Sequence, residues 1–143
     1  MIYFYIMYEE LDGEVYEIAS LIHAEWRRTH YDEATKSYTP RIKETNDAEW
    51  IRAHNGTREV DIANLEFQDL PEDWKKESLS AARQAKSLLN DALILVHDRW
   101  LEHNEANATE EQKLRYAKLS KEEKQKDVLV IEDALKVIKK HLN

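Results

Sequence analysis

The chain has 143 residues, of which 42% are apolar and 35% charged, and this size and composition suit a single folded domain. Only two glycines and two prolines are present, too few for the turns of an all-β protein, so we expect a mostly helical fold. The net charge of -8 disfavours nucleic acid as a partner, and the lack of cysteine excludes disulfides and thiolate sites. The apolar segment 1–7 is too short to span a membrane and lacks the basic flank of a secretion signal. We therefore expect a cytoplasmic protein with no membrane segment.

The first predicted helix covers about residues 12–30. Asp12 is a favourable cap for its N-terminus. Apolar residues then recur at spacings of three and four, from Val15 to Trp26, which predicts one buried face.

Residues 31–66 form the least regular part of the sequence. Pro40 breaks any helix, residues 46–52 are typical of a short helical turn, and Asn55-Gly56 ends that turn. Residues 59–63 favour a short extended segment or a turn. The segment is rich in large apolar residues, so we expect it to pack on the helices.

The remainder of the chain predicts three further helices. Pro71 begins one that runs to about residue 89, and a break near Asn90-Asp91 separates it from the next, which ends near Asn104. Thr109 to Gln112 and Ser120 to Glu123 both match a capping box. The last helix is expected to bury one apolar face made of Val128, Ile131, Leu135, Ile138 and Leu142.

One pattern occurs twice along the chain. Two aliphatic residues precede His-x-x-Trp at His23 and again at His97, and an aromatic-x-x-Leu element follows at Phe67 and again at Tyr116. From Phe67 onward the two copies keep a constant spacing of 49 residues. The first copy is longer by about 25 residues, which is the irregular segment.

We interpret this pattern as two helix–connector–helix repeats in a single domain, 1–143, with repeat one at about 12–89, including the insertion 31–66, and repeat two at about 91–142. The fold class predicted is all-α, with a short extended segment allowed in the insertion. Four main helices would pack with approximate two-fold pseudosymmetry, because one repeat cannot bury both its faces alone.

The repeated pattern resembles the ryanodine-receptor repeat, a helical module found in tandem pairs in calcium-release channels and in small bacterial and phage proteins. The second half matches the family pattern best, with His97-Asp-Arg-Trp100, Tyr116-Ala-Lys-Leu119 and then Glu123-Lys124-Gln-Lys-Asp127. The first half keeps His23, Trp26, Phe67 and Leu70, but has Phe in place of Tyr, and Ser78 in place of Asp. The Gly-Trp…Tyr-Gly stretch usual in the family's connectors is absent. The resemblance implies a paired-repeat helical fold and a regulatory or binding role, without a known catalytic activity.

The two histidines have two interpretations. Each lies three residues before a Trp, so the two side chains share a helix face. In the first interpretation, the His and Trp side chains together bind a ligand. In the second, each histidine lies in the core and hydrogen-bonds to a carbonyl, a carboxylate or the Tyr116 hydroxyl, which fixes how the connector packs. The second interpretation is favoured, because buried polar groups need partners and a repeat reproduces them twice. The candidate ligand-binding residues are His23, Trp26, Arg27, His97, Trp100 and Tyr116.

Other chemistry has weaker support in the sequence. Arg27, Arg28, Arg41 and Lys43 are placed to hold a phosphate, but acidic residues lie among them, which favours a solvated face. No His-Glu-x-x-His motif, Walker motif or Gly-rich loop occurs, so no metal, cofactor or catalytic residue is predicted.

The sequence favours a non-enzymatic binding or regulatory module that recognises a protein partner or a small ligand in the groove between the repeats. One alternative is a structural helical protein that associates with itself, for example as a homodimer. A second alternative is an enzyme acting on a nucleotide-like substrate.

Overall fold

A computed structural model describes residues 12–142, so the expectations for the apolar segment 1–7 lie outside the described residues. The chain is mostly helical, as predicted. It divides into two compact units, Met1–Lys86 and Ser87–Asn143, and the boundary falls inside the longest helix, α4 (Glu72–Asn104).

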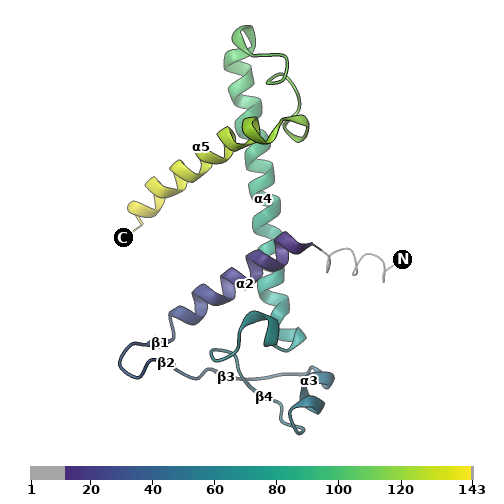
Figure 1. Ribbon diagram of the computed structural model, residues 1–143, viewed down its shortest axis with the longest axis vertical. Coiled ribbons are helices and arrows are strands. Elements are labelled where there is room, and N and C mark those ends of the chain that lie inside the picture. Colours follow the sequence, from purple (N-terminus) through teal and green to yellow (C-terminus); the bar gives the residue numbers. More distant parts are fainter. Residues whose placement is uncertain (1–11, 143) are drawn as a thin grey trace, which may run out of the picture. The chain divides into compact units, whose positions relative to one another are not determined.

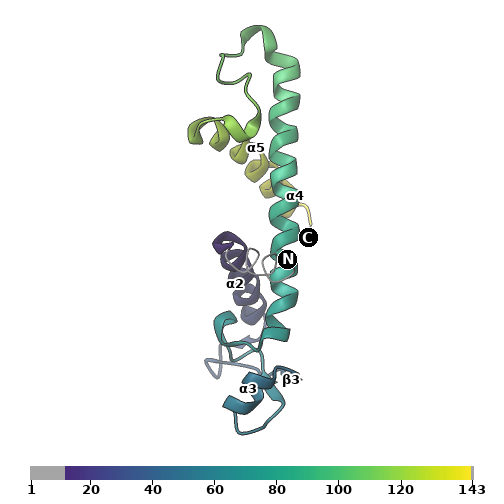
Figure 2. The same ribbon diagram turned by 90° about the vertical axis from the view of Figure 1, so that its right-hand side faces the viewer.

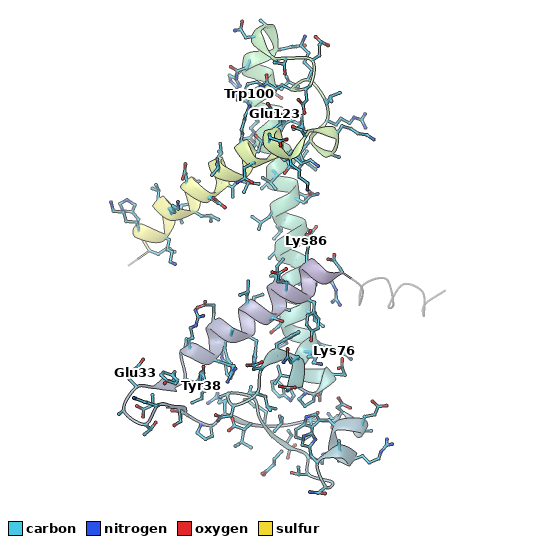
Figure 3. The ribbon with its side chains drawn as sticks, viewed as in Figure 1. Glu33, Tyr38, Lys76, Lys86, Trp100 and Glu123 are labelled. Carbon is cyan, nitrogen blue, oxygen red and sulfur yellow. The ribbon has the colours of Figure 1, made fainter. Side chains whose placement is uncertain are left out.

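The first unit begins its described part with helix α2 (Gly13–Arg28), close to the predicted bounds (Figure 1). The Asp12 carboxylate accepts hydrogen bonds from the N–H groups of Glu14 and Val15, which confirms its role as cap. The same carboxylate lies 2.7 Å from Nζ of Lys86 on α4 (Figure 3). This ion pair ties the start of α2 to α4.

The irregular segment folds into two short antiparallel strand pairs around one short helix. Tyr31 pairs with Tyr38 in the first, and Lys43 pairs with Val60 in the second. Asn55 and Gly56 both have positive φ, so the predicted end of the short helical turn is confirmed. The elements are β1 (Tyr31–Asp32), β2 (Ser37–Tyr38), β3 (Ile42–Glu44), α3 (Ala48–Ala53), β4 (Glu59–Asp61) and the 3₁₀ helix η1 (Phe67–Asp69).

This segment supplies much of the first unit's core, as its apolar composition predicted. Val60 and Ile62 are buried and cluster with residues of α2 and α4 and with Phe67, which directly follows the segment. Trp26, Trp50 and Trp74 pack around the cluster and are partly buried. The buried members of the cluster are Val15, Ala19, Val60, Ile62, Phe67, Leu70 and Ala82.

The predicted break near Asn90-Asp91 is wrong, because α4 runs without interruption through both residues. Asn and Asp cost a helix interior only a fraction of a kcal/mol, and no Gly or Pro lies nearby to stop it. Two of the four predicted main helices are therefore one helix. The four α-helices among residues 12–142 are α2, α3, α4 and α5, and α3 has only six residues.

The second unit contains the C-terminal part of α4, two 3₁₀ helices and α5 (Figures 1 and 2). Thr109 and Gln112 form both hydrogen bonds of a capping box, but only a single turn follows them. Ser120 caps α5 by accepting from the Glu123 N–H. The elements are η2 (Glu105–Asn107), η3 (Tyr116–Lys118) and α5 (Lys121–Lys140).

The predicted burial of the whole apolar face of α5 is wrong. Val128 and Ile131 are partly buried, but Leu135, Ile138 and Leu142 are each more than half exposed. Within the second unit, only the first turns of α5 are packed, and the burial of Asp127 marks that contact. The regular spacing of apolar residues predicts which residues share a face, but not how far along the helix that face is covered.

Candidate functional site

His23 and His97 make the same contact, each within its own unit. Nε2 of His23 lies 2.8 Å from the carbonyl oxygen of Leu65, and Nε2 of His97 lies 2.9 Å from that of Leu114. A carbonyl can only accept, so Nε2 carries the proton and donates in both. Both histidines are buried, at 6% and 4% exposure. Each therefore holds a connector against a helix, which is the packing interpretation of the sequence.

The surroundings of the two contacts also match. The ring of His23 lies 6.4 Å from that of Phe67 at 55°, and the ring of His97 lies 6.4 Å from that of Tyr116 at 56°. Each aromatic residue begins a 3₁₀ helix that is followed by a buried leucine, Leu70 or Leu119. In both units the long helix begins two residues after that leucine.

The units differ at one position beside the histidine. Asp127 is the seventh residue of α5, and its carboxylate Oδ2 lies 3.7 Å from Nδ1 of His97. Both side chains are nearly buried, at 12% and 5% exposure. Burial raises the pKa of Asp127 against the opposing attraction of His97, while Glu123 raises it further and Lys126 lowers it. The corresponding residue of α4, its seventh, is Ser78.

In the first unit, the space beside His23 is a cavity of about 770 Å³, which we call the first-unit cavity. That volume lies within the usual range for small-molecule sites. Four apolar side chains and two tryptophans line it, and Arg41, Lys43, His30 and Glu77 supply charged or ionisable groups. The lining residues are Ile22, His23, Trp26, His30, Arg41, Lys43, Ile62, Leu70, Trp74, Glu77, Ser78 and Ala81.

Several of these lining groups are held in place by the fold. The Trp26 ring stacks on that of His23 at 22° and also contacts His30. The Trp74 indole donates to the Glu44 carbonyl oxygen at 2.9 Å. The backbone of Arg41 is hydrogen-bonded to Asp61 and Ile62 on β4 and just after it. The cavity wall is therefore preformed.

The cavity is positively charged on one side. Arg41 and Lys43 form no ion pair with any other residue in the described part of the chain, and Glu77 is exposed. His23 has its second ring nitrogen, Nδ1, without a hydrogen bond to a described residue. Burial lowers the pKa of His23; the bond to Leu65 opposes this, and Arg27 adds to it.

The six residues singled out from the sequence fall into four groups. His23 and Trp26 line the first-unit cavity. Arg27 does not; its Nε donates to the Ala63 carbonyl oxygen, and its guanidinium lies 4.3 Å from the centre of the Tyr38 ring. His97 and Tyr116 pack together in the second unit, where burial and the charge of Asp127 raise the pKa of Tyr116. Trp100 is 39% exposed.

Sequence reasoning missed His30 and Ser78 as neighbours of the site. His30 lies four residues after Trp26, a spacing that places both on one helix face. Ser78 was noted only as a departure from the repeat pattern. The signal for it was the size difference between Ser78 and Asp127, because the shorter serine leaves space where the second unit has a carboxylate.

No family model matches the chain, and neither a curated protein nor a solved structure is detectably similar to it. No three side chains of residues 12–142 come together as metal ligands would. No helix in that range has both the length and the apolar character needed to cross a bilayer. The geometry of the two units therefore carries the functional argument.

Proposed function

We propose that this chain is a binding module that takes a small ligand in the first-unit cavity. The observation that carries the proposal is a cavity of about 770 Å³ whose wall combines fixed tryptophan faces with Arg41 and Lys43, two cations that form no ion pair within residues 12–142. A cavity of mostly apolar lining with a few fixed polar groups is typical of small-molecule sites. The position of Arg41 and Lys43 also gives the insertion 31–66 a role, since both residues come from it.

We further propose that the two units are copies of one helix–connector–helix module of the ryanodine-receptor-repeat type. The matched histidine contacts, ring angles and helix starts support this, together with the spacing of 49 residues that relates Leu65 to Leu114. In this proposal the histidine is part of the module's frame, and binding depends on what surrounds it in each copy.

Thermal-shift screening against a library of metabolites tests the binding proposal. A ligand at about 100 times its Kd stabilises the folded state by roughly 2.7 kcal/mol. For a unit of this size, that corresponds to a rise in Tm of roughly 10–20 °C. A cavity-filling variant, Ile22→Trp, locates the site, because Ile22 lines the cavity.

Leu21→Trp is the matched control, since Leu21 is the neighbouring residue on α2 and is 60% exposed. The expected result is a shift that Ile22→Trp loses and Leu21→Trp keeps. Binding that survives in Ile22→Trp, or a library that leaves Tm unchanged throughout, would overturn the proposal.

A further inference from the structure

The strongest difference between the two units is the residue that faces the histidine from the following helix. Ser78 and Asp127 hold the same place, the seventh residue of α4 and of α5. The helices that carry them begin after matching 3₁₀ turns, and the histidines they approach make matching bonds to a connector carbonyl. The second unit therefore has a carboxylate beside its histidine where the first has only a hydroxyl.

We propose that the first-unit cavity binds the carboxylate of a small, flat organic acid, in the place that the Asp127 carboxylate takes in the second unit. This inference rests on the binding function proposed above and names the ligand class. The carboxylate would lie between Nδ1 of His23, the Ser78 hydroxyl and the cations Arg41 and Lys43, all of which line the cavity.

The charges around the cavity support an anion. Arg41 and Lys43 approach from the β3 side, and neither has an acidic partner among the described residues. Among the described residues, Glu77 on α4 is the one acid that lines the cavity, and it is exposed. Arg41 is exposed and Lys43 is half-buried, and a bound carboxylate would give both cations a partner in a charge-assisted hydrogen bond.

The apolar part of the wall supports a flat molecule. Trp26 and Trp74 present fixed rings, the first stacked on His23 and the second anchored through its indole N–H. Aromatic faces bind flat, apolar groups favourably. Ile22 and Ile62 complete this side of the cavity.

The hydrogen bond from Nε2 to Leu65 gives the binding a defined pH dependence. Because Nε2 already donates to the carbonyl, Nδ1 of neutral His23 has no proton. Its lone pair repels a carboxylate. Binding must therefore add a proton at Nδ1, and affinity should rise as the pH falls. The ionisable groups around His23 are Arg27 on α2, which acts on its charge, and four that line the same cavity: His30 just after α2, Arg41 and Lys43 from the β3 side, and Glu77 on α4.

Calorimetric titration with indole-3-acetate and indole-3-acetamide tests the inference, because the two probes share the indole and differ only in the group that would meet His23, a charged carboxylate or a neutral amide. We expect the acetate to bind at least about tenfold more tightly than the amide, the usual value of a charged hydrogen bond. We also expect its affinity to increase from about pH 8 to about pH 5, through and below the ordinary histidine pKa because that of free His23 is lowered, while the amide's does not.

Two variants locate the carboxylate. Ser78→Asp places in the first unit the carboxylate that the second unit already has, so it should abolish acetate binding and raise the pKa of His23, measured by NMR. Ser80→Asp adds the same charge on the exposed face of α4 and should leave binding within about twofold. Arg41→Gln is an exposed change that does not threaten folding; it should weaken the acetate about tenfold, with Arg52→Gln as its control.

Equal binding of acetate and amide, or unchanged acetate binding in Ser78→Asp or Arg41→Gln, would overturn this inference and leave the cavity a site for an uncharged ligand. If neither indole binds, the inference is also overturned. In that case the thermal-shift library decides separately whether the cavity takes any ligand, since a shift lost in Ile22→Trp would uphold the proposed function alone.

Discussion

Replacing His23 by asparagine or glutamine separates the hydrogen bond of the histidine contact from its packing. The glutamine amide extends about as far as Nε2 of histidine and can still donate to the Leu65 carbonyl, whereas the asparagine amide extends only to the position of Nδ1. An unsatisfied, part-buried carbonyl costs about 1–3 kcal/mol. Loss of ring contacts with Trp26 and Phe67 adds about 1 kcal/mol. His23→Asn should therefore lose about 2–4 kcal/mol of unfolding free energy, and His23→Gln about 1 kcal/mol.

Urea unfolding followed by circular dichroism and tryptophan fluorescence measures these losses. Two compact units can unfold in separate steps, so residue-resolved hydrogen exchange assigns the loss to the first unit. The connector amides around Leu65 should exchange faster in His23→Asn than in His23→Gln. In the second unit, His97→Asn and His97→Gln should give the same order around Leu114.

Equal destabilisation by asparagine and glutamine would refute the reasoning, because the effect would then come from ring packing alone. A loss below about 0.5 kcal/mol for His23→Asn would also refute it, since that is the size of an ordinary surface substitution.

Three further predictions concern the pH dependence and the packing of the two units. The pKa of His23 is lowered from its ordinary 6.5, so its neutral form stabilises the fold above that pH, and this stability is lost as the pH falls through the lowered pKa. Between about pH 7 and about pH 5, urea melts of wild type should therefore lose more stability than those of His23→Gln. The pKa of Asp127 is raised from 3.8, so the stability contributed by its neutral form is fully present below that pH and is lost as the pH rises through the raised pKa. In urea melts, Asp127→Asn should therefore gain stability relative to wild type from about pH 4 to neutral pH. A difference in stability between the two proteins that stays constant over this range would contradict the prediction. The buried Thr45 hydroxyl donates to Asp73 at 2.7 Å, so Thr45→Val should cost about 1–3 kcal/mol in a urea melt, whereas exposed Thr39→Val should stay within about 0.5 kcal/mol.

Local signals in the sequence predicted local structure well. Asp12 caps α2 as expected, and Asn55-Gly56 adopts positive φ as expected, because both effects depend on the backbone within a few residues. The predicted break at Asn90-Asp91 was wrong because the local signal there was weak. Polar residues that often cap a helix were taken to end one, although neither Gly nor Pro was present to make the end favourable.

The histidine contacts were predictable in kind but not in partner. A repeated histidine on an apolar face needs a hydrogen-bond acceptor, and the sequence offered a carbonyl, a carboxylate or a hydroxyl. The carbonyls of Leu65 and Leu114 leave no trace in the sequence, because every residue has a carbonyl. Asp127 was identified in the sequence as a residue that matches the family pattern, but its contact with His97 was not predicted.

The first-unit cavity could not be predicted from periodicity, because it depends on a small residue and on an insertion. Apolar spacing identifies the side chains that fill a core, whereas a cavity arises where a side chain is too short to fill the space. Ser78 leaves space beside His23 that Asp127 takes up beside His97, and the insertion brings Arg41 and Lys43 to the same place. If the two units descend from one module, the second has kept an internal partner for its histidine and the first has exchanged it for an open site. Binding should therefore be confined to the first unit. In the calorimetric titration with indole-3-acetate, Asp127→Ser should leave the affinity of the first-unit cavity unchanged, whereas Ser78→Asp should abolish binding.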